Sequence, residues 1–173
     1  MALEKMEGLS KPVIAAVQGY CLAGGFEMMM AADLVIAAED ARIGDQHINY
    51  GLFGGGGCAY RLALLVGMRK AKEIVLTGKR LSGKDAEQLG LVNLAVPPDR
   101  LESSVNEMAA ELGSKSPVAI KLSKWFINRV AMLDADTRLE LAIMYSLIDS
   151  TSEDKEEGMR AFLEKRKPVF KGR

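Results

Sequence analysis

A short apolar strand that leads into a glycine-rich turn and then a helix is the feature that most constrains this fold. Residues 13–17 read Val-Ile-Ala-Ala-Val, an apolar run rich in β-branched residues that predicts a buried strand. The turn follows at residues 19–27, which read Gly-Tyr-Cys-Leu-Ala-Gly-Gly-Phe-Glu. Residues 28–32, Met-Met-Met-Ala-Ala, are apolar on all sides and predict a buried helix.

The turn has the composition of a site for a negatively charged oxygen. The first N–H groups of a helix lack partners within it, and the helix dipole favours negative charge there. Gly24 and Gly25 place no side chain in front of these groups, and the Glu27 carboxylate follows in the first turn. A hydrogen-bond donor beside a carboxylate suffices for chemistry next to a carbonyl group. The alternative is structural: the glycines permit close packing, and Glu27 complements the dipole.

Length and composition exclude several classes of protein. The 173 residues suit a domain with a core of ordinary size, and 49% of them are hydrophobic. The formal net charge is zero, which gives no general attraction for nucleic acid or a membrane surface. No apolar run is long enough to span a bilayer, and the first residues lack a signal-peptide pattern.

The cysteines indicate a reducing compartment. Cys21 and Cys58 lack the spacing of metal ligands and stand in apolar or glycine-rich surroundings. Free, buried thiols are the usual state of such residues in a reducing environment. We therefore expect a cytoplasmic protein without a metal site.

Strands are predicted in the first half of the chain and helices in the second. The expected strands after the turn cover residues 34–38, 41–44 and 91–96, and helices are expected at residues 58–66 and 68–76. Further helices are expected after the capping signals of Ser82, Asp99 and Ser116, at residues 136–149 and in a last segment at residues 152–167. The helix at 136–149 is apolar around most of its circumference, so we expect it to be buried within the subunit or against another one.

A polar loop and a second glycine cluster lie between these elements. Residues 45–51 read Asp-Gln-His-Ile-Asn-Tyr-Gly and include His47, the single histidine, which could act as an acid or base near neutral pH. Residues 54–57 are all glycine, but no Lys-Ser/Thr pair follows, so this is not a phosphate-binding P-loop. The cluster is interpreted as backbone that passes close to a ligand or another chain.

Several motifs occur in an order that resembles one known family. Residues 11–20 read Lys-Pro-Val-Ile-Ala-Ala-Val-Gln-Gly-Tyr, and residues 23–27 read Ala-Gly-Gly-Phe-Glu. Leu-Thr-Gly at 76–78 and Gly-Leu-Val at 90–92 follow, and residues 157–170 read Glu-Gly-Met-Arg-Ala-Phe-Leu-Glu-Lys-Arg-Lys-Pro-Val-Phe. This series resembles the enoyl-CoA hydratase/isomerase, or crotonase, superfamily over essentially the whole chain. Ala23 replaces the first glycine of the family's G-G-G-x-E turn.

The resemblance implies an α/β fold with a crotonase-like ββα spiral core. Residues 1–98 would form the C-terminal part of that core, with the active-site turn, and residues 99–173 a helical trimerisation region. Trimers of the family commonly pair into hexamers, so a homotrimer or hexamer is expected. The family's N-terminal third has no counterpart here, and Met1 is expected to fall within the helix before the second half. Whether the chain is a fragment, starts internally or is completed by a separate chain stays open, and alone it is expected to be a poor catalyst.

The resemblance also implies roles for single residues. The N–H of Gly24 would be one of two donors to the thioester oxygen, Gly25 would line the substrate site, and Glu27 would be one of two catalytic glutamates. Phe162 and Lys165 match positions that contact the coenzyme A of a neighbouring subunit; the alternative for Lys165 is an ordinary solvated helix end.

The second catalytic glutamate of the hydratases aligns with His47, which departs from the family pattern. His47 would share the proton transfer or form a polar wall of the pocket. Asp45, two residues earlier, is the second candidate for the missing carboxylate.

These roles predict an enzyme of acyl-CoA, and hence fatty acid, metabolism. The expected reaction is the hydration of a 2-enoyl-CoA, a lyase activity that passes through a thioester enolate stabilised by an oxyanion hole. No cofactor is expected, because coenzyme A is part of the acyl-CoA thioester substrate. Double-bond isomerisation and thioester hydrolysis are alternatives on the same scaffold. The non-enzyme alternative is an inactive oligomeric or RNA-binding relative, although the neutral charge argues against nucleic acid.

Overall fold

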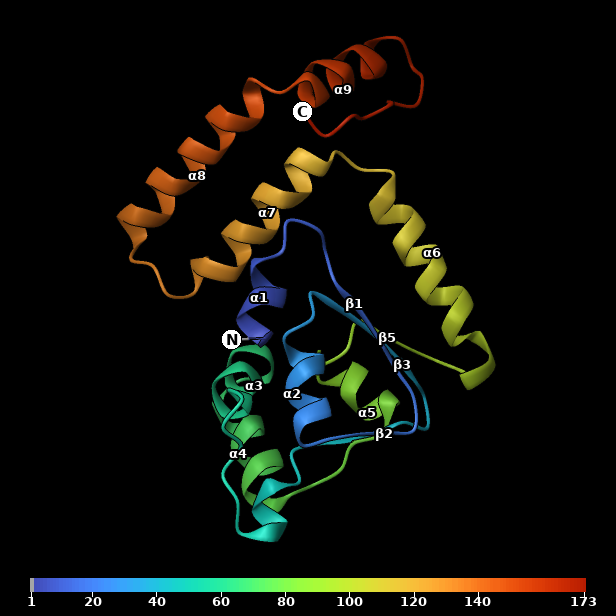
Figure 1. The fold of residues 1–173 in the computed structure, drawn as a ribbon, viewed down its shortest axis with the longest axis vertical. Helices are drawn as coiled ribbons and strands as arrows, with labels where there is room; N and C mark the ends of the chain where they lie inside the picture. The colour runs from blue at the N-terminus through green and yellow to red at the C-terminus, as the bar shows by residue number, and fades with distance from the viewer. Residues whose placement is uncertain (1) are drawn as a thin grey trace. The chain divides into compact units, whose positions relative to one another are not determined.

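The computed structural model describes residues 2–173, so the prediction for Met1 lies outside the described residues (Figure 1). The chain divides into two compact units. The first comprises residues 2–7 and 13–108, and the second comprises residues 8–12 and 109–173. The expected boundary between residues 98 and 99 stays a prediction. Among the described residues, no helix combines the length and the apolar character needed to cross a membrane.

Two small parallel sheets form the frame of the first unit. β1 (Ile14–Val17), β3 (Leu34–Ala38) and β5 (Leu94–Val96) form a three-stranded sheet in the order β1-β3-β5. β2 (Tyr20–Leu22) pairs with β4 (Arg42–Gly44). The predicted strands are present, although the one expected at residues 91–96 covers only Leu94–Val96, and β2 lies within residues that the sequence predicts as turn. Three residues in a glycine-rich stretch carry too little periodicity to indicate a strand, and β2 is defined by its pairing with β4.

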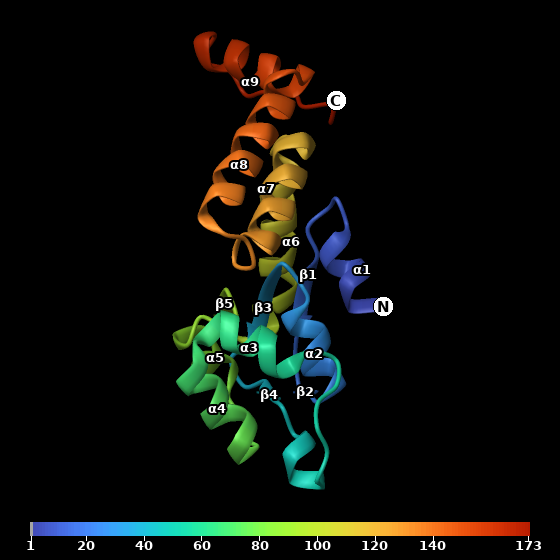
Figure 2. The ribbon, with the colours of Figure 1, turned by 90° about the vertical axis from the view of Figure 1, so that its left-hand side faces the viewer.

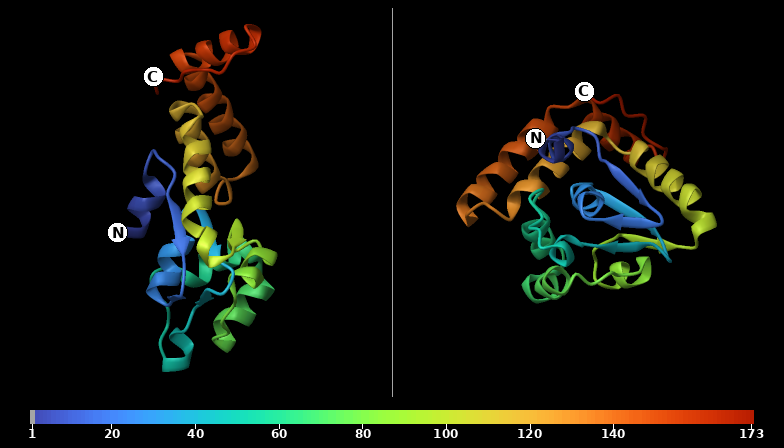
Figure 3. Two further views of the ribbon diagram at one scale, coloured as in Figure 1. Left: turned by 90° about the vertical axis from the view of Figure 1, so that its right-hand side faces the viewer. Right: turned by 60° about the horizontal axis from the view of Figure 1, so that its bottom comes forward.

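Helices pack around these strands. They are α1 (Ala2–Gly8), α2 (Gly24–Met30), α3 (Cys58–Val66), α4 (Met68–Thr77) and α5 (Gly83–Gln88), with the 3₁₀ turns η1 (His47–Tyr50) and η2 (Pro98–Arg100). The helix expected to open in the glycine turn begins at Gly24, and Glu27 lies in its first turn as predicted. Figure 2 shows α3 and α4 side by side, and α2 packs against β2 and α3 (Figure 3). Phe26 of α2 is fully buried in the resulting core, which fixes the helix that carries Glu27.

The second unit is helical. α6 (Leu101–Gly113) enters it, and α7 (Pro117–Val130), α8 (Ala135–Ser150) and α9 (Glu153–Leu163) complete it. The side chains of Ser116, Asp134 and Ser152 each accept the backbone N–H three residues later, which defines the starts of these three helices.

No residue of α8 is buried in the described chain. Burial of this apolar helix within the subunit was therefore a wrong expectation, whereas its burial against another subunit stays a prediction. The exposed large apolar side chains of α8 are Leu139, Ile143, Met144, Leu147 and Ile148.

Candidate active site

The N-terminus of α2 begins with an unusual backbone conformation. Ala23 has φ 47° and ψ −117°, a left-handed conformation that costs a residue with a side chain about 1–3 kcal/mol. The surroundings hold it there: its N–H donates to the carbonyl of Gly44 at 3.3 Å, and its carbonyl accepts the N–H of Glu27 at 3.0 Å. The chain therefore turns sharply from β2 into α2, which places Gly24 at the first position of the helix.

The first amides of α2 are open. Among residues 2–173, the N–H groups of Gly24 and Gly25 donate to no other group. A Cβ atom added to either glycine would meet no atom within 4 Å. These residues therefore offer adjacent, unoccupied donors with free space beside them, as an oxyanion would require.

The Glu27 side chain is held by the second glycine cluster. Only 8% of Glu27 is exposed, and its Oε1 accepts the N–H of Gly56 at 2.7 Å. A Cβ added to Gly56 would lie 2.5 Å from Cδ of Glu27, so a side chain at this position would displace the carboxylate. Glycine at position 56 therefore lets the backbone bind a buried carboxylate directly.

The same cluster contacts His47, the first residue of η1. A Cβ added to Gly54 would lie 3.0 Å from Nδ1 of His47. Gly54 and Gly56 are two residues apart, which spans at most about 7 Å of chain. The structure thus brings Glu27 and His47, from α2 and η1, against one short segment of backbone.

Asp45 is the direct partner of His47. Its Oδ1 is hydrogen-bonded to Nδ1 of the imidazole and accepts the backbone N–H of His47 at 3.3 Å. Only 2% of Asp45 is exposed. The carboxylate therefore holds the imidazole from the inside of the unit.

Hydrogen bonds from Gln46 fix the loop that carries this pair. Its Nε2 donates to the carbonyl of Gly78 at 2.7 Å, and its Oε1 accepts Nε of Arg80 at 2.9 Å and Nδ2 of Asn49 at 3.2 Å. A Cβ at Gly78 would meet the Asn49 amide at 2.5 Å, so this contact also depends on glycine. His47 consequently lies on a rigid support rather than on a free loop.

An apolar cavity lies beside the pair. It has a volume of about 320 Å³ and an apolar lining to which η1, α3 and α4 contribute. Asp45 and Cys58 form part of its wall. The other lining residues are Ile48, Leu52, Phe53, Gly54, Ala59, Ala63, Met68, Ala71, Lys72, Val75 and Leu76.

Cys58 lies between the acidic groups but is not a nucleophile. Burial raises the pKa of its thiol to about 12, with further contributions from the charge and hydrogen bond of Asp45 and the charge of Glu27. A thiol is nucleophilic only when ionised, so Cys58 stays inert at neutral pH. Within the described residues, no group of three or more His, Cys, Asp or Glu side chains could hold a metal ion.

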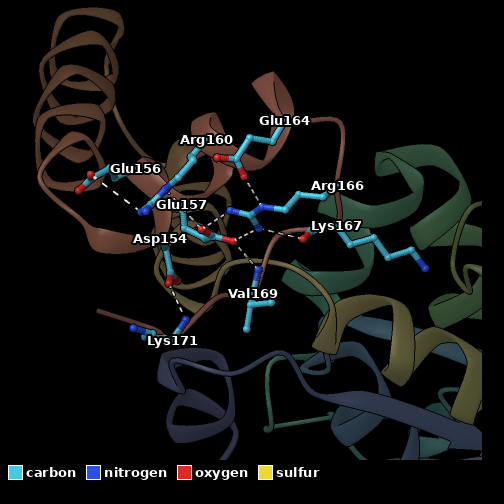
Figure 4. Close-up of polar contacts among 9 residues, drawn as sticks. All are labelled: Asp154, Glu156, Glu157, Arg160, Glu164, Arg166, Lys167, Val169 and Lys171. Atoms are coloured by element: carbon cyan, nitrogen blue, oxygen red, sulfur yellow. Dashed lines mark hydrogen bonds and ion pairs between the residues drawn. The ribbon is translucent and has the colours of Figure 1, made fainter.

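The two C-terminal candidates lie in the second unit. Phe162 is 78% exposed on α9, and Lys165 follows the helix with φ 52°. Arg166 holds this turn: its Nη1 and Nη2 donate to Glu157 at 2.6 and 2.9 Å, and its Nε donates to Glu164 at 2.6 Å (Figure 4). The pKa of Glu157 is lowered to about 2, mainly by its hydrogen bond with Arg166. Glu157 and Arg166 are therefore both charged at neutral pH.

The structure adds residues to the predicted site. Gly54 and Gly56 contact the two ionisable side chains, and Asp45 binds His47. The glycine cluster is visible in the sequence, but nothing there indicates which glycine meets which side chain. The spacing of Asp45 and His47 likewise does not reveal that the two side chains point toward each other.

Comparisons with known proteins agree on one family. A sequence profile described as "Enoyl-CoA hydratase/isomerase" matches residues 2–173. The chain is 41% identical over 163 residues to the short-chain-enoyl-CoA hydratase of Clostridium acetobutylicum, covering 94% of this chain and 62% of that protein. It is 39% identical over 166 residues to the crotonyl-CoA hydratase of Syntrophomonas wolfei, covering 95% and 64%. The chain thus spans less than two thirds of the length of these relatives.

Solved structures show the same fold. The enoyl-CoA hydratase of Bacillus anthracis superposes with a TM-score of 0.96 at 37% identity, covering 99% of this chain and 66% of that one. The α/β fold of crotonase type expected from the motifs is confirmed, whereas trimerisation through the helical region stays a prediction. Because the profile, the relatives and the superposition all extend over nearly the whole chain, it belongs to the enoyl-CoA hydratase/isomerase family.

Proposed function

We propose that the protein is an enzyme that adds water to a 2-enoyl-CoA through a thioester enolate. The main observation behind this proposal is the start of α2, where the open N–H groups of Gly24 and Gly25 precede the buried carboxylate of Glu27. Its relatives named as hydratases of short-chain enoyl-CoA and crotonyl-CoA support a short 2-enoyl-CoA as the substrate.

The open amides bind the oxygen on which charge develops. When water adds to C3 of the enoyl group, electrons move onto the thioester oxygen, and the N–H of Gly24 donates a hydrogen bond to it. Loss of one such donor typically lowers kcat by about 10²–10³. Gly25 leaves the space beside this donor free for the substrate.

The two ionisable side chains divide the proton transfer. Glu27 accepts a proton from the attacking water, and the hydrogen bond from Gly56 fixes the direction of its carboxylate. His47, at the position of the second glutamate, exchanges a proton at C2. The apolar cavity beside Asp45 and Cys58 takes the acyl chain, because its lining is mostly apolar and offers few polar partners.

The second unit contributes to binding and assembly in this proposal. Phe162 and Lys165 contact the coenzyme A bound to a neighbouring subunit, with the ammonium group of Lys165 near its phosphates. The exposed apolar face of α8 packs against other subunits in a homotrimer or hexamer. The reaction proceeds without a separate cofactor, since coenzyme A arrives as part of the substrate.

The test is Glu27→Gln, assayed for hydration of crotonyl-CoA. We expect kcat to fall by about 10²–10⁴ while binding of crotonyl-CoA is retained, because the amide keeps the shape but cannot accept the proton. Exposed Glu102 provides the matched control, and Glu102→Gln should leave turnover unchanged.

Three outcomes would contradict parts of the proposal. Turnover of Glu27→Gln within a few-fold of the parent would remove Glu27 from the mechanism. Conversion of a 3-enoyl-CoA without hydration would indicate an isomerase, and release of free coenzyme A would indicate a hydrolase. Binding of single-stranded RNA without any effect of acyl-CoA on thermal stability would favour a non-catalytic relative.

A further inference from the structure

Asp45 and His47, the two candidates for the role of the family's second catalytic glutamate, form a hydrogen-bonded pair of carboxylate and imidazole. Asp45 is 2% exposed, and its Oδ1 is hydrogen-bonded to Nδ1 of His47. Asp45 carries no N–H or O–H when ionised, so the hydrogen atom in this bond belongs to the imidazole. This leaves Nε2 as the nitrogen of His47 that can exchange a proton with a substrate.

We propose that Asp45 is a positioning residue that holds His47 in the Nδ1–H tautomer, with Nε2 as its proton-exchanging atom. The proposal rests on the proposed function for the reaction in which Nε2 takes part. It goes beyond that function because it assigns the atom of His47 that reacts and the residue that selects it.

The residues around His47 hold its imidazole in a fixed orientation toward Asp45. Gly54 packs against Nδ1 of His47, and the Gln46 hydrogen bonds to Gly78 and Arg80 hold the intervening residue. His47 is the first residue of η1, and its carbonyl accepts a hydrogen bond from the N–H of Leu52 at 3.0 Å. The imidazole is thus held on its Nδ1 side, and a buried partner of this kind normally sets the tautomer of a histidine.

The proton balance of the step is complete. The oxygen of water bonds to C3 while one of its protons passes to Glu27, and the enolate takes a proton at C2 from Nε2 of the imidazolium. His47 then remains as the neutral Nδ1–H tautomer, still bound to Asp45. Exchange with solvent removes the proton from Glu27 and returns one to Nε2, so no other reactant is required.

The chain offers a direct spectroscopic test because His47 is its only histidine. Nitrogen-15 labelling of histidine gives one imidazole, whose shifts and couplings identify the protonated nitrogen at a pH at which the ring is neutral. We expect the Nδ1–H tautomer in the parent chain. In Asp45→Asn the amide can donate to Nδ1, so the proton should move to Nε2. The exposed Asp40 gives the matched control, and Asp40→Asn should leave the tautomer unchanged.

Kinetics test the positioning role separately. Asp45→Asn should lower kcat for hydration of crotonyl-CoA by about 10²–10⁴ with KM within a few-fold, because the amide no longer stabilises the imidazolium that donates its proton from Nε2. An Nε2–H tautomer in the parent would overturn the proposal even if Asp45→Asn did not fold. A flipped tautomer with unchanged kcat would also overturn it. Failure of the parent to hydrate any 2-enoyl-CoA would instead contradict the proposed function, because the tautomer is read without turnover.

Discussion

The two units of the chain are stabilised by different kinds of contact. In the first unit, an apolar core packs around α2, β4, α3 and α4, with Phe26, Ile43 and Leu62 fully buried. In the second unit, among the described residues, the buried apolar side chains are Leu122 and Ala161. The first unit therefore has the hydrophobic interior of an ordinary domain, and the second has little of one.

Among the described residues, the second unit buries two charged side chains, Lys124 and Asp154, beside its two apolar ones. Asp154 is 2% exposed and accepts hydrogen bonds from the hydroxyl of Ser116 and the backbone N–H groups of Lys171 and Gly172. Lys124, also buried, donates to the carbonyl of Lys11 at 3.1 Å. The comparison shows that apolar packing forms the interior of the first unit, whereas buried hydrogen bonds link separate segments of the second.

The largest effect is expected from removal of an aromatic ring from the first unit. Phe26→Ala should lower the free energy of unfolding by about 3–5 kcal/mol, because it leaves a cavity in a fully buried position. Chemical denaturation followed by circular dichroism measures the change. The control is Phe53→Ala, since Phe53 is 83% exposed and should contribute little. Equal losses for both variants would mean that the core described for the first unit is not what stabilises it.

A smaller effect, specific to the second unit, is expected for Asp154→Asn. Loss of the charged acceptor should destabilise this unit by about 1.5–3 kcal/mol at neutral pH. Hydrogen exchange at the N–H groups of Lys171 and Gly172 reports the change locally. Asp136→Asn, at an exposed site on α8, should leave this exchange unchanged.

The same carboxylate predicts the direction of the pH dependence. Burial by itself raises the pKa of Asp154, but the hydrogen bonds from Lys171, Ser116 and Gly172 outweigh it, so the folded pKa lies below the ordinary value. The stabilisation is therefore present above the unfolded pKa of about 3.9 and lost as the pH falls through the folded pKa. The difference between the parent and Asp154→Asn should shrink accordingly in acid. A difference that grew in acid would contradict this assignment.

The smallest effect on stability is expected on the exposed face of α8. Leu147 is 62% exposed, so Leu147→Gln should change the stability of the single chain by less than about 0.5 kcal/mol. The same variant should weaken self-association, measured by sedimentation velocity, if the face packs against another subunit. A loss of about 2 kcal/mol at concentrations where the chain is monomeric would show that Leu147 belongs to an interior of the second unit.

Local sequence patterns predicted much of the fold because local interactions define those elements. Apolar runs and the residues that end them predict β1, β3 and α3. The capping signal predicted at Ser82 is present as a capping box, with the Ser82 hydroxyl accepting the N–H of Asp85 and the Asp85 carboxylate accepting the N–H of Ser82. Asp99, which the sequence also predicts as a cap, lies instead within η2, before α6 begins at Leu101.

The parts that the sequence could not predict depend on contacts between distant residues. β2 exists through its pairing with β4, which lies about twenty residues later. Hydrophobic periodicity likewise cannot predict the exposure of α8, because an apolar helix has the same sequence pattern whether or not another element covers it. In the site, the motif gives Gly24 and Glu27, whereas the contacts of Gly54 and Gly56 with the ionisable side chains come from tertiary packing.

The two glycines that touch these side chains have a mechanical consequence. Gly54 rests on the imidazole of His47 and Gly56 binds the carboxylate of Glu27, within three consecutive residues. A ligand that moves this segment moves the neighbours of both side chains in a single displacement. In the proposed mechanism, substrate entry would therefore change the surroundings of the acid and of the base together.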